Sequence, residues 1–168
     1  MRFPELIILH FSMNFVWGKY VITNFTQCGN PMVYINFDCK IPTTGYQFCD
    51  ILHKSSVEDG ENFRFESTIE RLRGKKWRTL LNIKEEKGIC KTLETYMKDV
   101  FYKALEISNE TKQCPLRKGT IQIKNLELDE NILKIIVLPK GKLRLHVKTY
   151  EKSSGKPGHC LDFEIESL

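Results

Sequence analysis

The stretch from Cys114 to Cys160, CPLRKGTIQIKNLELDENILKIIVLPKGKLRLHVKTYEKSSGKPGHC, decides the fold. It begins with a Cys-Pro corner, contains two segments in which apolar and polar residues alternate, and ends at a late cysteine. Alternation with a period of two is typical of a strand that buries one face. Strands whose apolar faces meet across a closed end form a cup. A cup lined by Ile, Leu and Val suits an acyl chain and carries no catalytic equipment.

The same alternation recurs along the rest of the chain. The alternating segments are residues 33–37, 63–70, 77–84, 121–124, 143–148 and 161–166. A polar turn that contains Gly74 separates the second and third of these segments and predicts a hairpin. Residues 153–158 predict the turn between the last two strands. We therefore expect an all-β protein, an antiparallel β-cup or immunoglobulin-like sandwich with an apolar cavity.

One segment departs from this pattern. Between residues 91 and 106 the apolar residues recur at helical spacing, with charged residues opposite. They are Leu93, Met97, Val100, Phe101, Ala104 and Leu105. This spacing predicts one amphipathic helix that is tied near its start by Cys90. Such an apolar stripe is more typical of core packing than of ligand contact.

The N-terminus has the order of a secretory signal peptide. Arg2 precedes an apolar block that is too short to span a bilayer, and small or modest side chains follow at Val16-Trp17-Gly18. This order predicts a signal peptide over residues 1–18, with a buried N-terminal strand or helix as the alternative. The rest, residues 19–168, has the length of one domain, and no later segment is apolar enough to cross a membrane. We expect a secreted, extracellular protein.

Cysteine usage favours the same compartment. All six cysteines follow the predicted cleavage point: Cys28, Cys39, Cys49, Cys90, Cys114 and Cys160. An even number of cysteines in an exported chain predicts disulfides, and the spacing leaves all the pairings open. Without a CxxC or HxxxH spacing, we expect no metal site. Two N-x-S/T triplets predict surface glycans at Asn24 and Asn109.

Charge and motifs argue against two classes of function. The formal charge of +5 is mild and mixes 26 basic with 21 acidic residues, which does not describe a nucleic-acid binder. No nucleophile elbow, P-loop, dinucleotide fingerprint or zinc-protease motif is present, so we expect neither catalysis nor a cofactor. His159 is next to Cys160, but a disulfide explains that cysteine better than a nucleophile does.

Two features could carry binding. The first is the apolar run over residues 132–138, closed by Pro-Lys-Gly, which fits either a buried strand or a loop at the mouth of a pocket. The second is a basic turn beside Trp77. Its cations are Arg71, Arg73, Lys75, Lys76 and Arg78. A solvated hairpin tip explains the turn most simply, and attraction to anionic lipid headgroups is the alternative.

Several of these motifs together resemble a known family. They are Gly88-Ile89-Cys90 with the helix that follows, the C-P-L-R-K-G-T element at 114–120, the L-P-K-G element at 138–141 and the final cysteine strand. Over roughly residues 60 to 168 the chain resembles the ganglioside-activator-like branch of the ML (lipid-recognition) superfamily. Within that branch it is most similar to secreted insect proteins of the CheB-type chemosensory group. The resemblance implies a disulfide between Cys90 and Cys114 and another from an N-terminal cysteine to Cys160.

The resemblance also implies a function. We expect a non-enzymatic carrier that holds a lipid or small hydrophobic ligand in an apolar cavity, in pheromone chemosensing or glycolipid presentation. We place Met97, Phe101, Ile135, Ile136 and Leu138 at that cavity or its mouth. A membrane surface or a receptor protein is the further partner to be expected. The alternatives are an accessory or co-receptor protein that acts by protein–protein contact, and a weak lipid hydrolase.

Overall fold

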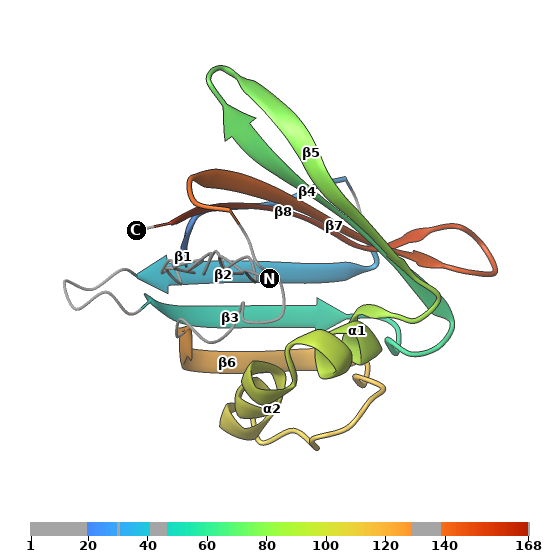
Figure 1. The fold of residues 1–168 in the computed structure, drawn as a ribbon. Coiled ribbons are helices and arrows are strands. Elements are labelled where there is room, and N and C mark those ends of the chain that lie inside the picture. The colour runs from blue at the N-terminus through green and yellow to red at the C-terminus, as the bar shows by residue number, and fades with distance from the viewer. Residues whose placement is uncertain (1–19, 30, 41–46, 129–138, 168) are drawn as a thin grey trace, which may run out of the picture.

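The protein is a sandwich of two antiparallel sheets with a helical segment along one side (Figure 1). The computed structural model describes residues 20–29, 31–40, 47–128 and 139–167. Within these residues, the five-stranded sheet has the order β1-β8-β7-β4-β5 and the three-stranded sheet has the order β2-β3-β6. The strands are β1 (Tyr20–Gln27), β2 (Val33–Lys40), β3 (Gln47–Ser55), β4 (Phe63–Arg73), β5 (Lys76–Glu85), β6 (Gly119–Leu128), β7 (Lys142–Glu151) and β8 (Pro157–Ser167). The expected all-β, antiparallel architecture is confirmed.

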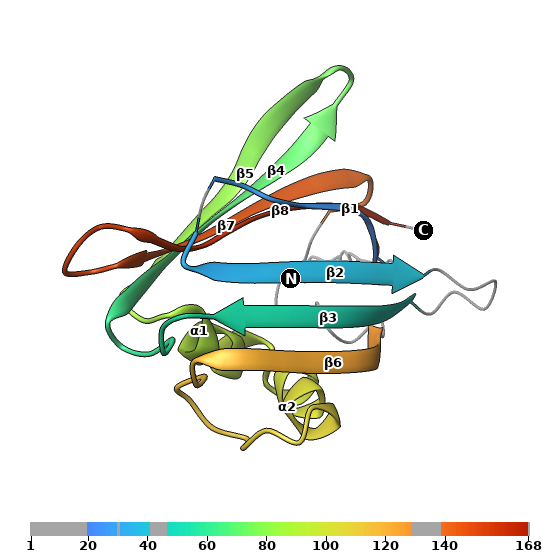
Figure 2. The ribbon, with the colours of Figure 1, turned by 180° about the vertical axis from the view of Figure 1, so that it is seen from behind.

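The β4–β5 hairpin forms where the alternation predicted it. Arg73 pairs with Lys76 across a two-residue turn, and Gly74 takes the positive φ of 62° that such a tight turn requires. Along β4, side chains alternate between a buried face and a more exposed one. In both views the hairpin reaches away from the three-stranded sheet, so the two sheets diverge toward β5 (Figures 1 and 2).

The two sheets meet in a packed core around β2 and β8. Val33 and Ile35 of β2 and Leu161 of β8 form its fully buried centre. Beside them, the rings of Phe25, Phe37 and Phe163 lie with centroids 4.9 to 5.3 Å apart, in the tilted and edge-to-face arrangements that aromatic rings prefer. This part of the interior is therefore filled by side chains of the protein.

The helical segment is divided, which corrects the expectation of one helix over residues 91–106. Helix α1 covers Ile89–Tyr96 and helix α2 covers Lys98–Ile107. Met97 lies between them with φ −138° and ψ 37°, outside helical geometry. The change of direction lets α1 contact β4 while α2 contacts β6. The helices thus bridge the two sheets along one side.

Three disulfides join all six cysteines. They are Cys28–Cys160, Cys39–Cys49 and Cys90–Cys114. The two links that the family resemblance implied are confirmed, and Cys28 is the N-terminal partner of Cys160. The first disulfide ties β1 to β8, the second joins paired positions of β2 and β3, and the third anchors α1.

Two strands, β1 and β3, were not expected from the alternation. Each contains a register shift, between Ile22 and Asn24 and between Cys49 and Ile51, which breaks the period of two. The predicted signal peptide at residues 1–18 and the apolar run at 132–138 lie outside the described residues. In the part of the chain that the structure does describe, no helix is long and apolar enough to cross a membrane.

Candidate functional site

The apolar inner face of the five-stranded sheet extends beyond the packed core. Ile69 of β4 is paired with Leu145 of β7 on one side and with Leu81 of β5 on the other, so all three side chains share one face. Ile69 is 2% exposed, whereas Leu81 is 41% exposed. Ile83, two residues further along β5 on the same face, is half-buried. The apolar surface therefore continues to the edge strand β5, where it is no longer covered.

The opposite wall is formed by β6 and the helices. Ile121 and Leu126 of β6 are buried, and Ile123 between them is half-buried. Helix α2 contacts this strand, and its Phe101 and Leu105 pack with Cys90 in a second buried cluster. Two largely apolar walls thus face each other where the sheets diverge.

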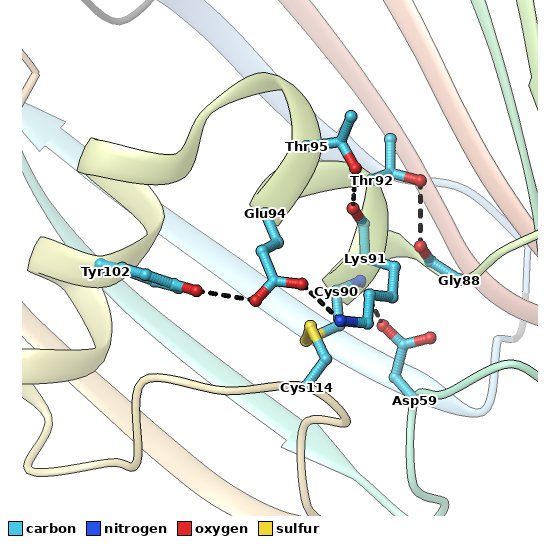
Figure 3. The surroundings of a disulfide bond; sticks show 9 residues. All are labelled: Asp59, Gly88, Cys90, Lys91, Thr92, Glu94, Thr95, Tyr102 and Cys114. Atoms are coloured by element: carbon cyan, nitrogen blue, oxygen red, sulfur yellow. Dashed lines mark hydrogen bonds and ion pairs between the residues drawn. A yellow bond between two sulfur atoms is a disulfide. The ribbon is translucent and has the colours of Figure 1, made fainter.

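A disulfide and a buried carboxylate hold the helical wall in place (Figure 3). Cys90 is bonded to Cys114, and its backbone N–H donates to Asp59 Oδ2 at 2.8 Å. Burial raises the pKa of Asp59 to about 6, against the lowering effect of hydrogen bonds from the backbone of Cys90 and Ile89. A Cβ on Gly88 would collide with the Asp59 carboxylate, so this close approach requires glycine.

A polar bridge joins the two helices. Glu94 of α1 accepts from Lys91 Nζ at 2.6 Å and from the Tyr102 hydroxyl of α2 at 2.7 Å (Figure 3). The Lys91 hydrogen bond, followed by that of Tyr102, lowers the pKa of the Glu94 carboxyl. The bridge therefore stabilises the turn at Met97 when the carboxylate is charged.

The predicted ligand-binding residues occupy different environments. Met97 is half-buried at the junction of the helices, and Phe101 is 7% exposed in the cluster beside the disulfide. Ile135, Ile136 and Leu138 lie outside the described residues. Ligand contact by these five residues stays a prediction, and so does a closed cavity between the walls.

The predicted glycosylation sites are both on the surface. Asn24 is exposed on β1, and Asn109 is exposed just after α2 with a φ of 57°. Neither side chain is buried against the rest of the protein, so both are open to modification. Glycosylation itself stays a prediction.

The interior also holds two histidines that sequence reasoning did not assign. His53 of β3 and His159 of β8 are 6% and 1% exposed, with ring centroids 5.9 Å apart. Desolvation lowers the pKa of His53 to about 4; for His159, desolvation and then the neighbouring His53 lower it to about 3. The sequence does indicate the inward position of His159, because the alternation that turns Leu161 inward also turns His159 inward.

A shallow polar depression lies on the outer face of the five-stranded sheet. It has a volume of about 170 Å³ and is lined by Asn24, Thr26, Arg144, His146, Asp162 and Glu164. Its charged groups already pair with one another: Arg144 contacts Glu164 at 2.9 Å, and His146 contacts Asp162 at 2.6 Å. Across the described residues, no cluster of three or more His, Cys, Asp or Glu side chains could hold a metal ion. The charged side chains that line the depression are therefore paired with one another across neighbouring strands.

The chain is similar to one family model and to several solved structures. Residues 63–145, just under half of the chain, match the model of a protein family of unknown function, DUF1091. No curated protein matches the chain. A Niemann-Pick type C2 protein from Japanese carpenter ant aligns at 13% identity and a TM-score of 0.41, over 86% of this chain and 98% of that chain. Chicken MD-1, solved in complex with lipid IVa, aligns over the same shares at 13% identity and a TM-score of 0.37.

These findings define the protein by its architecture. It is a disulfide-linked, two-sheet antiparallel β protein whose apolar inner face is open along one edge strand.

Proposed function

We propose that this protein is a secreted, non-enzymatic carrier that holds a lipid or other hydrophobic ligand between its diverging sheets. One observation carries the proposal: the inner apolar face that is fully buried at Ile69 continues to Leu81, which is 41% exposed. Soluble proteins rarely leave the continuation of a core surface open to water unless something covers it. A bound apolar ligand would cover it.

The energy available to such a ligand is substantial. Each buried methylene contributes about 0.8 kcal/mol, so eight methylenes contribute about 6 kcal/mol before the cost of immobilising the ligand. Rigid walls lower that cost, because less of the protein is ordered on binding. The Cys90–Cys114 link holds the helical wall, and Cys28–Cys160 ties β1 to β8 within the five-stranded sheet.

The cysteines and the family resemblance support the finer parts of the proposal. Three disulfides favour an oxidising, extracellular environment. The Cys114–Thr120 element and the helix bonded through Cys90 resemble lipid-recognition proteins of the insect chemosensory group. On that basis the ligand would be a pheromone-like molecule or a glycolipid, presented to a receptor or taken from a membrane.

The test compares two equally drastic substitutions on opposite faces. Leu81→Asp places a charge on the inner apolar face, and Tyr34→Asp places one at the most exposed aromatic position on β2, which is 48% exposed. We expect Leu81→Asp to weaken binding of the fluorescent probe 1-aminoanthracene at least tenfold and Tyr34→Asp to leave it unchanged. Native mass spectrometry of the purified wild type should also show a co-purified hydrophobic molecule.

Two results would overturn the proposal. Unchanged probe binding by a folded Leu81→Asp variant would remove the inner face from the site. Failure of the wild type to bind any hydrophobic probe would reject the carrier and favour an accessory role through protein contact.

A further inference from the structure

The two buried histidines form a polar spot between the sheets. His53 comes from the three-stranded sheet and His159 from the five-stranded sheet, and their rings stack at 30° with centroids 5.9 Å apart. Both side chains are more than nine-tenths buried. Such a pair joins two facing sheets beside a core cluster of Val33, Ile35 and Leu161, and buried polar groups need hydrogen-bond partners.

Most of their hydrogen-bonding capacity is unused within the part of the chain that the structure describes. Thr149 Oγ1 accepts the backbone N–H of His159 at 2.8 Å and lies 2.9 Å from His159 Nδ1. The remaining ring nitrogens, His159 Nε2 and both nitrogens of His53, have no partner among the described residues. A neutral imidazole has one N–H donor and one acceptor nitrogen, so His53 offers both. The spot can therefore serve a group that donates, accepts or does both.

The charge state of the two histidine rings limits the class of ligand group that they can bind. Because burial holds the pKa of His53 at about 4 and that of His159 at about 3, both rings are neutral at physiological pH. Neutral rings would not offset the cost of burying a charged headgroup. They suit an uncharged hydroxyl, aldehyde or ester.

The surroundings connect this spot to the open apolar face. His53 is paired with Ile35 and Ile121 on its sheet, and Thr149, the partner of His159, is paired with Phe65 on the other. From Phe65 the inner face runs four residues along β4 to the level of Leu81. Strand spacing and rise put Leu81 about 20 Å from His159. That distance is comparable to an extended long alkyl chain.

We propose that His53 and His159 bind the uncharged polar end of a long-chain ligand, such as an alcohol, aldehyde or ester, whose alkyl chain lies along the inner face toward Leu81. This assignment rests on the proposed carrier function. It adds the orientation of the ligand and the chemistry of the group that is bound deepest.

The experiment compares two ligands of equal chain length, dodecan-1-ol and dodecane, as competitors of 1-aminoanthracene. The wild type should bind dodecan-1-ol about tenfold more tightly than dodecane, a difference of about 1.4 kcal/mol. His53→Leu should abolish that preference and keep the affinity for dodecane. His53→Gln, which retains an amide donor and acceptor, should keep part of the preference.

A second readout uses the unmodified protein and does not depend on variants that fold. In nitrogen-15 NMR spectra, dodecan-1-ol should shift the ring nitrogens of His53 and His159, and dodecane should not. Equal binding of both ligands with unshifted ring nitrogens would reject the histidine anchor while the carrier function stands. Binding of neither ligand would overturn the carrier function itself.

Discussion

Acidification should destabilise this protein through its buried histidine pair. The pKa values of His53 and His159 lie far below the ordinary value of 6.5, at about 4 and about 3. Between pH 6.5 and pH 4 the unfolded chain therefore binds two protons that the native state does not bind. Stability rises with pH wherever the unfolded state binds more protons, so it must fall as the pH falls through this window.

The size of the stability loss follows from the pKa differences between the native and unfolded states. Each pH unit is worth 1.36 kcal/mol per proton, so each histidine costs about 3–4 kcal/mol by pH 4. Asp59 acts in the opposite direction, because its pKa is raised from 3.8 to about 6 and its native state takes up the proton first. On the same scale Asp59 offsets about 3 kcal/mol of this cost, which leaves a net decrease of about 4 kcal/mol in the free energy of unfolding. Such a loss is a large share of the stability of an ordinary domain.

The assay is urea unfolding at pH 7, 5.5 and 4 with the disulfides intact. His53→Leu should make the loss of stability between pH 7 and pH 4 smaller by about 3–4 kcal/mol than in the wild type. Asp59→Asn should make it larger by about 3 kcal/mol, because the opposing group is gone. Comparing each protein with itself across pH removes any constant cost of the substitution. An equal pH dependence in the wild type and His53→Leu would refute the reasoning.

Two other predictions concern packing and covalent links. A Cβ added at Gly158 would lie 2.6 Å from Phe63 Cε1 and 2.7 Å from Thr149 Oγ1, so Gly158→Ala should lower the free energy of unfolding by about 1–3 kcal/mol, measured by urea unfolding; a loss below 0.5 kcal/mol would mean that the buried ring moves freely. The Cys28–Cys160 disulfide spans 132 residues, so replacing both cysteines by serine should cost about 4–5 kcal/mol in the same measurement. A free energy of unfolding unchanged by that double substitution would contradict the predicted stabilisation by this disulfide.

Alternation predicted the strands in which apolar residues recur at a period of two. The hairpin of β4 and β5 and the strands β6, β7 and β8 were all visible because apolar residues occupy every second position. Strand β3 was not, because its inward positions include Gln47, His53 and Ser55 and its register shifts at Cys49. A period of two is lost when the buried face is partly polar and the strand is bulged.

The site was harder to predict than the fold, for physical reasons. The divergence of the sheets, which exposes Leu81 beside buried Ile69, depends on packing between distant strands and leaves no local pattern. The break at Met97 likewise depends on α1 and α2 contacting different sheets, since the apolar spacing runs through it without interruption. The histidine pair needs residues that lie 106 positions apart to meet, although each alternates correctly within its own strand.

The pairing of β1 with β8 has a consequence for biosynthesis. The first described strand finds its partner only in the last one, and their covalent link joins Cys28 to Cys160. The five-stranded sheet therefore cannot be completed until β8 has been synthesised. Until then the apolar face of the nascent sheet lacks its outer strand, and the early thiols must wait for their late partner. Completion of this sheet during biosynthesis is thus tied to the emergence of β8 and to the oxidation of Cys28 and Cys160.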